Sequence, residues 1–99
     1  MNDPLLLAKK LNELAQLASK SENSFEHAAI YSATKAIRSD FDKEEDEFTS
    51  YTLEKVSNAC WHICASIGYD VTNGLEKTEH ISSAYGNIST LISILEKEA

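Results

Sequence analysis

Residues 57–66 read SNACWHICAS, and this stretch decides between two kinds of protein. It places two cysteines four positions apart, with Trp61 and His62 between them. The thiols and the imidazole belong either to a metal or redox site or to the middle of a buried helix. The segment contains neither proline nor glycine, and the whole chain has only one proline and three glycines. This scarcity favours helices over turns and loops.

Helical geometry separates the histidine from the two thiols. Successive residues of a helix turn by about 100° around its axis, so Cys60 and Cys64 lie about 40° apart and His62 about 160° from both. A tetrahedral zinc site needs four ligands that converge on one point. The four-residue spacing of the two cysteines also differs from the thioredoxin-like CxxC and the haem-attaching CxxCH patterns. The cysteines are therefore predicted to be core residues, and Trp61 to lie at the edge of the core or in an exposed binding patch.

Amphipathic patterns extend from this segment in both directions along the chain. Apolar residues recur at three- and four-residue spacing in four segments, which predicts helices at about residues 4–20, 25–38, 44–67 and 76–97. Pro4 suits the first turn of a helix, and Gly68 suits the position after a helix end. No alternating strand pattern, internal repeat or interdomain linker is visible. The sequence predicts an all-α, single-domain, small antiparallel four-helix bundle.

The second predicted helix has an apolar face that is rich in alanine. We assign its inner face to Phe25, Ala29, Ala33, Ala36 and Ile37. The small alanine side chains would let a neighbouring helix approach closely. The other helices are expected to bury stripes of larger residues, such as leucine and isoleucine.

The charge of the chain limits the classes of partner. It has 16 acidic and 9 basic residues and a formal net charge of -7, which repels nucleic-acid phosphates and anionic lipids. No apolar run approaches the roughly 20 residues that span a bilayer, and no signal-peptide pattern is present. We expect a cytoplasmic protein that binds a basic protein surface, with no direct nucleic-acid or membrane binding.

Most of the clustered negative charge lies in one run at the start of the third predicted helix. Six of the eight residues 40–47 carry a carboxylate, and Lys43 is the only basic residue among them. The run is expected to occupy the loop and first turn of that helix, where the positive end of the helix dipole stabilises acidic groups. Together with Trp61 it forms the predicted partner-binding surface. The acidic members are Asp40, Asp42, Glu44, Glu45, Asp46 and Glu47.

No set of catalytic residues is visible in the sequence. His27 and His80 each stand alone in a predicted helix, and the Glu-x-x-His pattern of di-iron bundles does not occur. Nucleophile-elbow glycines and a phosphate-cradling loop are also absent. The sequence therefore predicts a protein that is not an enzyme and holds no cofactor or metal.

The leading hypothesis is a non-enzymatic, acidic protein-binding module, such as an inhibitor, an immunity-like protein or a small regulatory protein. In size, charge and helix number the chain is similar to the acidic four-helix immunity proteins of bacteriocins. It lacks the tyrosine-rich helix motif through which the immunity proteins of nuclease colicins recognise their toxins. Such a likeness of class implies a helical fold and a protein partner.

Two other functions and the oligomeric state stay open. One alternative is a small-molecule or metal-binding helical bundle, with the histidines or the two thiols as ligands. The other is an acidic mimic of DNA, which needs carboxylates at phosphate-like intervals along a surface. Tyr31, Tyr51, Trp61 and Tyr69 are candidates to cover one another across a two-fold axis, since aromatic residues are enriched at interfaces. A homodimer is therefore possible alongside a monomer.

Overall fold

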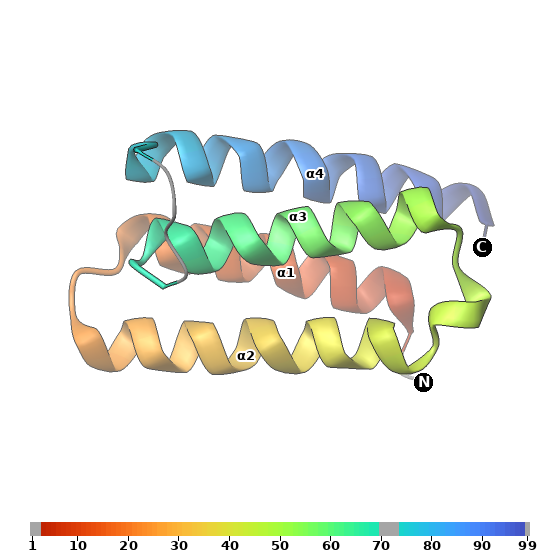
Figure 1. Ribbon diagram of the computed structural model, residues 1–99, viewed down its shortest axis with the longest axis horizontal. Helices are drawn as coiled ribbons and strands as arrows, with labels where there is room; N and C mark the ends of the chain where they lie inside the picture. Colours follow the sequence, from red (N-terminus) through yellow and green to blue (C-terminus); the bar gives the residue numbers. More distant parts are fainter. Residues whose placement is uncertain (1–2, 70–73, 99) are drawn as a thin grey trace.

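The computed structural model describes residues 3–69 and 74–98. Within these ranges the chain forms four α-helices and one short 3-10 helix. The elements are α1 (Pro4–Lys20), α2 (Ser24–Lys43), η1 (Glu45–Glu47), α3 (Ser50–Ser66) and α4 (Lys77–Glu98). Consecutive α-helices run in opposite directions (Figure 1). The predicted all-α, antiparallel four-helix bundle is confirmed.

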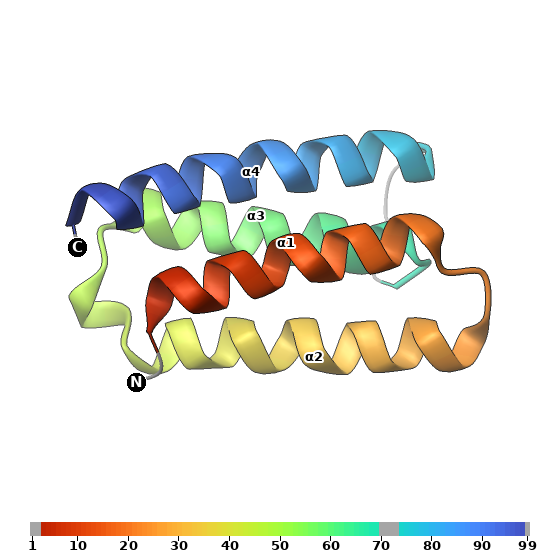
Figure 2. The same cartoon turned by 180° about the vertical axis from the view of Figure 1, so that it is seen from behind.

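The helices enclose one hydrophobic core to which all four contribute. α3 packs most extensively against α4, and α1 packs against both α4 and α2. α2 and α4 lie on opposite sides of the other two helices (Figure 2). Among the largest fully buried side chains are Leu11 of α1, Phe41 of α2, Ile63 of α3 and Ile88 of α4. Burial of such side chains stabilises the fold by about 1.5–3 kcal/mol each.

Short polar side chains fix the starts of three helices. The carboxylate of Asp3 accepts a hydrogen bond from Leu5 N at 3.0 Å before α1. Asn23 Oδ1 accepts one from Glu26 N at 2.9 Å before α2. Thr49 Oγ1 accepts one from Thr52 N at 3.1 Å. This last cap places the start of α3 at Ser50, so the predicted start at residue 44 is wrong.

The second helix is longer than predicted, because it continues past Arg38 to Lys43. Phe41 lies one turn after Ile37 and is 0% exposed, with its ring centroid 5.4 Å from that of Phe48. Burial of this ring stabilises the additional turn. As a result, Asp40 and Asp42 lie in the last turn of α2 rather than in a loop.

The predicted inner face of the second helix is correct at Ile37 and wrong at Phe25, Ala29 and Ala36. Phe25 is 89% exposed, and Ala29 and Ala36 are exposed as well. The buried residues of α2 are Ile30, Thr34, Ile37 and Phe41. These side chains are larger than alanine and remove more apolar area from water. The hydroxyl of Thr34 donates a 2.7 Å hydrogen bond to Ile30 O, which lets this polar residue lie in the core.

A glycine turn ends α3 almost where the sequence indicated. Gly68 has φ +92°, a left-handed conformation that favours glycine. Gly68 N donates to Ala65 O at 3.1 Å, and Tyr69 N donates to Cys64 O at 3.0 Å. This is the pair of hydrogen bonds that closes a helix end after a glycine. Residues 70–73 of the turn predicted before α4 lie outside the described residues.

Candidate functional site

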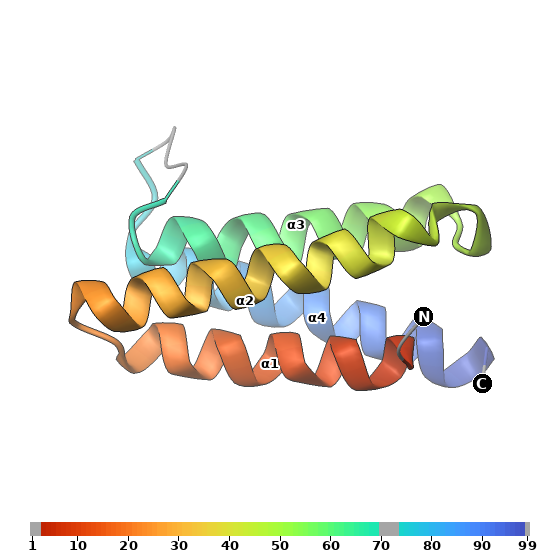
Figure 3. The ribbon, with the colours of Figure 1, turned by 90° about the horizontal axis from the view of Figure 1, so that it is seen from below.

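Three segments that are far apart in the sequence meet at one end of the bundle. The start of α1, the connection between α2 and α3, and the end of α4 lie together there (Figures 1 and 3). We call this part of the surface the acidic end. Its members are the acidic residues Asp3, Asp40, Asp42, Glu44, Glu45, Asp46, Glu47 and Glu98.

A hollow of about 320 Å³ lies within the acidic end. Its apolar lining comes from Pro4, Leu5, Phe48 and Leu95. Its acidic lining comes from Asp3, Glu47 and Glu98, one from each of the three segments. The hollow therefore combines an apolar surface with carboxylates. Sequence reasoning found the run at 40–47 but not its meeting with Asp3 and Glu98, since that depends on the helix directions.

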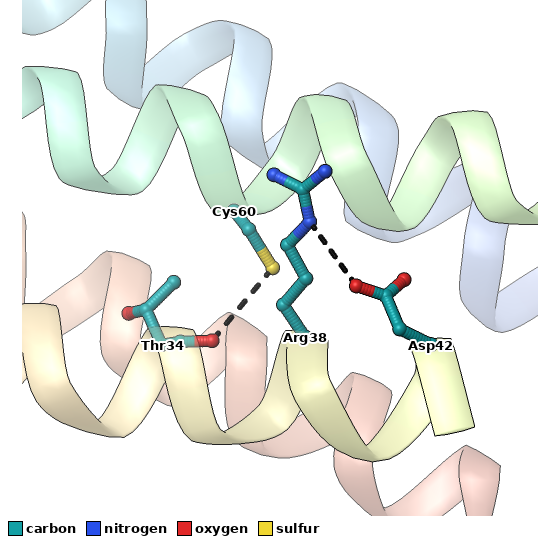
Figure 4. Close-up of polar contacts among 4 residues, drawn as sticks. All are labelled: Thr34, Arg38, Asp42 and Cys60. Carbon is teal, nitrogen blue, oxygen red and sulfur yellow. Dashed lines mark hydrogen bonds and ion pairs between the residues drawn. The ribbon is translucent and has the colours of Figure 1, made fainter. Parts of the chain in front are cut away.

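Most of the carboxylates predicted to bind a partner are accessible. Asp42 is exposed at the end of α2, and Glu45, Asp46 and Glu47 are exposed in η1. Asp40 and Glu44 are half-buried. Arg38 Nε lies 3.8 Å from Asp42 Oδ2, one turn along the helix (Figure 4). An exposed pair of this kind contributes little to stability.

The sequence had suggested that a helix dipole stabilises the acidic run, but the dipoles of α2 and α3 do not stabilise Asp40 and Asp42. α3 has no acidic residue in its first turn. Asp40 and Asp42 lie instead in the last turn of α2, where the dipole is negative. Glu98 likewise ends α4. The expectation that the dipole of the third helix stabilises this run is therefore wrong for Asp40 and Asp42.

Trp61 lies apart from the acidic end, in the second half of α3, and is half-buried. Its ring centroid is 4.9 Å from that of His62 and 5.3 Å from that of His80, both in edge-on geometry. The edge-of-core interpretation of Trp61 agrees with this position. The structure does not bring Trp61 together with the carboxylates that were grouped with it.

His62 and His80 form a contact between α3 and α4. Their Nδ1 atoms are 3.1 Å apart, a hydrogen-bond distance. His80 is 1% exposed, and its Nε2 has no hydrogen-bond partner in the described part of the chain. Burial, and secondly the charge of His80, lower the pKa of His62. Sequence reasoning missed this pair, although His80 shares the buried side of α4 with Ala84 and Ile88 at four-residue spacing.

The two cysteines are core residues, as predicted. Cys60 is 2% exposed and Cys64 1% exposed, and they are not joined in a disulfide. Burial, and secondly the neighbouring Cys64, raise the pKa of Cys60 to about 12. Its Sγ points to the carbonyl oxygen of Thr34 at 4.0 Å (Figure 4). A thiol in this state is not a nucleophile near neutral pH.

The residues named as metal ligands do not assemble into one site. His27 Nε2 lies 3.3 Å from Ser21 O, near the start of α2, whereas His62 contacts His80. In residues 3–69 and 74–98, no three or more His, Cys, Asp or Glu side chains are grouped so that they could hold a metal ion. A structural zinc site generally takes four such ligands.

No protein-family model, curated protein or solved structure matches the chain. A separate observation concerns the helices themselves: within the described ranges, none combines the length and the apolar character that crossing a membrane requires.

Proposed function

We propose that the protein is a non-enzymatic binding module that holds a basic protein partner at its acidic end. The observation that carries this proposal is the meeting of carboxylates from three separate segments around one hollow, lined by Asp3, Glu47 and Glu98. Partners in this class include the targets of inhibitors, immunity-like proteins and small regulators.

The lining of the hollow is suited to lysine and arginine side chains. These residues have an apolar stem and a cationic head, and they bury the stem while the head stays with polar groups. Leu5, Phe48 and Leu95 offer the apolar contact, and Glu47 and Glu98 lie beside them for the charged group. We propose that one basic side chain of the partner enters this hollow while others meet the exposed carboxylates of η1.

The positions of the charges also support a role in binding. Carboxylates at the negative ends of α2 and α4 are not stabilised by the helix dipoles. Their mutual repulsion lowers stability further, so folding alone does not account for the cluster. A concentrated negative field speeds the approach of a basic partner and loses this effect as salt is added.

The same arrangement favours a protein partner over the alternatives. A DNA mimic needs carboxylates along an extended surface, whereas the largest group here, residues 40–47 with Asp3 and Glu98, lies at one end of the bundle. We leave Trp61 out of the binding surface, since it lies in the second half of α3.

A matched pair of charge variants tests this proposal. The first variant replaces Glu45, Asp46 and Glu47 by Gln, Asn and Gln. The second replaces Glu13, Glu22 and Glu79, which are exposed away from the acidic end, by Gln. Each changes the formal net charge by three, from -7 to -4. The wild type and both variants are used as bait in extracts of the native host, and bound proteins are identified by mass spectrometry.

The expected result is a basic protein that the wild type and the second variant retain and the first variant loses. Because both variants carry the same net charge, a loss confined to the first assigns binding to the acidic end. Equal loss from both variants would show a dependence on net charge alone. Retention by both would remove the acidic end from the binding surface.

A further inference from the structure

We propose that His62 and His80 form a proton-sensitive latch between α3 and α4, closed when the pair is neutral and opened when it takes up protons. The two Nδ1 atoms are 3.1 Å apart and belong to the two helices with the most extensive contact in the bundle. This inference concerns a different part of the molecule from the acidic end and does not depend on the proposed function.

The closed latch needs one proton on one of the two facing nitrogens. A neutral imidazole has one donor and one acceptor nitrogen. We assign Nδ1 of His80 as the donor and Nδ1 of His62 as the acceptor. In this tautomer the unpartnered Nε2 of buried His80 carries only a lone pair. The opposite tautomer would bury an N–H group without an acceptor, which is the rarer and less favourable arrangement.

Protonation of both rings removes this hydrogen bond. An imidazolium donates from both nitrogens, so two protonated rings would direct two N–H groups at each other across 3.1 Å. A protonated His80 would also bury an Nε2–H group that finds no acceptor in the part of the chain described. Both problems are relieved if the α3 and α4 contact opens and water reaches the rings.

The charged groups on α4 do not offset these effects. Lys77 lies one turn before His80 and directs Nζ to Ser21 O, at 2.9 Å. The carbonyl of Glu76 accepts a hydrogen bond from His80 N at 3.1 Å, while Glu76 and Glu79 are exposed. Lys77 is therefore engaged by Ser21, and Glu76 and Glu79 face water.

The titratable groups described on the other helices do not stabilise a protonated pair either. On α1, Lys20 is exposed, and on α2, His27 lies against Ser21 O at 3.3 Å. On α3, the buried thiol of Cys60 has a pKa raised to about 12 and stays neutral. Burial and the charge of His80 lower the pKa of His62, and no carboxylate acts against them. Among residues 3–69 and 74–98, no carboxylate is paired with either ring to hold a proton in the closed state.

The test measures how often the contact opens as the pH falls. Trp61 is the single tryptophan of the chain and touches both rings, so its fluorescence reports on the pair directly. Hydrogen exchange of α3 and α4 amides, corrected for the intrinsic pH dependence, gives the opening constant. As the pH falls this constant should rise, by at most about tenfold per pH unit for each proton taken up on opening.

Three variants distinguish protonation of the His62 and His80 pair from an unspecific effect of low pH on the fold. H27Q removes the histidine outside the pair and should keep the wild-type rise in the opening constant. H80F replaces the buried imidazole by an apolar ring and should reduce the rise to the part that burial of His62 causes. H62Q changes a half-buried side chain and should lower the slope of the opening constant against pH. This variant should fold even if H80F does not.

A flat opening constant in the wild type between pH 7.5 and 5.5 would overturn the latch. So would an H62Q variant with the full wild-type slope. The measurements are repeated with a chelator, and the wild-type response should persist. A response that disappears with the chelator would assign the pair to metal binding instead.

Discussion

Tyr31 of α2 stacks on Tyr69, the residue that follows Gly68, with ring centroids 4.2 Å apart and ring planes 13° apart. Both side chains are half-buried against the core. The contact joins α2 to the end of α3. Two of the four aromatic residues proposed for a dimer interface thus contact each other within the chain. Tyr51 remains 53% exposed, and the homodimer stays a prediction that light scattering can test.

Removal of either stacked ring should destabilise the bundle. A pair of this kind contributes about 0.5–1.5 kcal/mol beyond the apolar area it buries. We expect a double-mutant cycle of Tyr31→Ala and Tyr69→Ala, measured by urea unfolding, to give a coupling free energy in this range. Tyr51→Ala paired with Tyr69→Ala is the control. A coupling near zero for the stacked pair would contradict the contact.

Phe25 and Ile37, both expected from the sequence on the inner face of α2, should respond differently to substitution. Phe25 is 89% exposed, so Phe25→Ser should change the free energy of unfolding by no more than about 0.5 kcal/mol. Ile37 is 8% exposed, and Ile37→Ala should lower it by about 2–5 kcal/mol because a cavity is left. Urea unfolding of both variants checks the difference. A larger loss from the Phe25 variant would restore the face that the sequence suggested.

The number and direction of the helices follow from the sequence because apolar spacing and end signals agree. Around α1 the predicted bounds match those observed, since Asp3 caps the helix and Pro4 occupies its first turn. The inner face of α2 was predicted only in part because two apolar patterns compete there. Spacing alone did not show that the face of Ile30 and Phe41 buries more area than the alanine face.

The candidate sites depend on contacts between helices, which a single sequence does not provide. The run at 40–47 was visible, but its approach to Asp3 and Glu98 requires knowing which helix ends meet. His62 was correctly placed away from the thiols. That side of α3 faces α4, where His80 completes the pair. The acidic run was assigned to the wrong helix end because Phe41 extends α2.

Charge at the two ends of α2 should affect stability in opposite directions. Asp40 lies near the negative end of the helix dipole, so Asp40→Asn should raise the free energy of unfolding by about 0.3–1 kcal/mol. Glu26 lies in the first turn and accepts a 3.1 Å hydrogen bond from Ser21 Oγ. Glu26→Gln should lower the free energy of unfolding by a comparable amount.

Salt separates the dipole effect from other causes. The gain from Asp40→Asn should shrink between about 0.01 M and about 1 M salt, as the Debye length falls from about 30 Å to about 3 Å. Urea unfolding at both salt concentrations measures the change. A loss of stability in Asp40→Asn at low salt would show that the cluster supports the fold instead.

Acidification should weaken the fold through His62. Its pKa is lower in the folded state than the ordinary value of 6.5, so the unfolded state binds the proton more readily. The stabilisation is therefore present above pH 6.5 and is lost as the pH falls through 6.5 towards the lower folded value. Since the side chain is partly exposed, we expect a loss on the order of a few tenths of a kcal/mol.

Chemical unfolding of the wild type and two variants between pH 7.5 and 5.5 checks this prediction. H27Q should follow the wild type, because His27 lies near Ser21 and away from the pair. H62Q should show a smaller decrease in the free energy of unfolding. An unchanged pH dependence in H62Q would assign the decrease to other groups.

Site-specific cross-linking tests the acidic end as a binding surface most directly. A photoreactive residue is placed at Glu47, which lines the hollow, or at Glu22, an exposed glutamate in the connection between α1 and α2 at the opposite end. After irradiation in the native host, cross-linked proteins are identified by mass spectrometry. Our account predicts one basic protein cross-linked from position 47 and not from position 22, with the yield reduced when Glu45 and Asp46 are also neutralised. Equal yields from the two positions, unchanged by neutralisation, would contradict it.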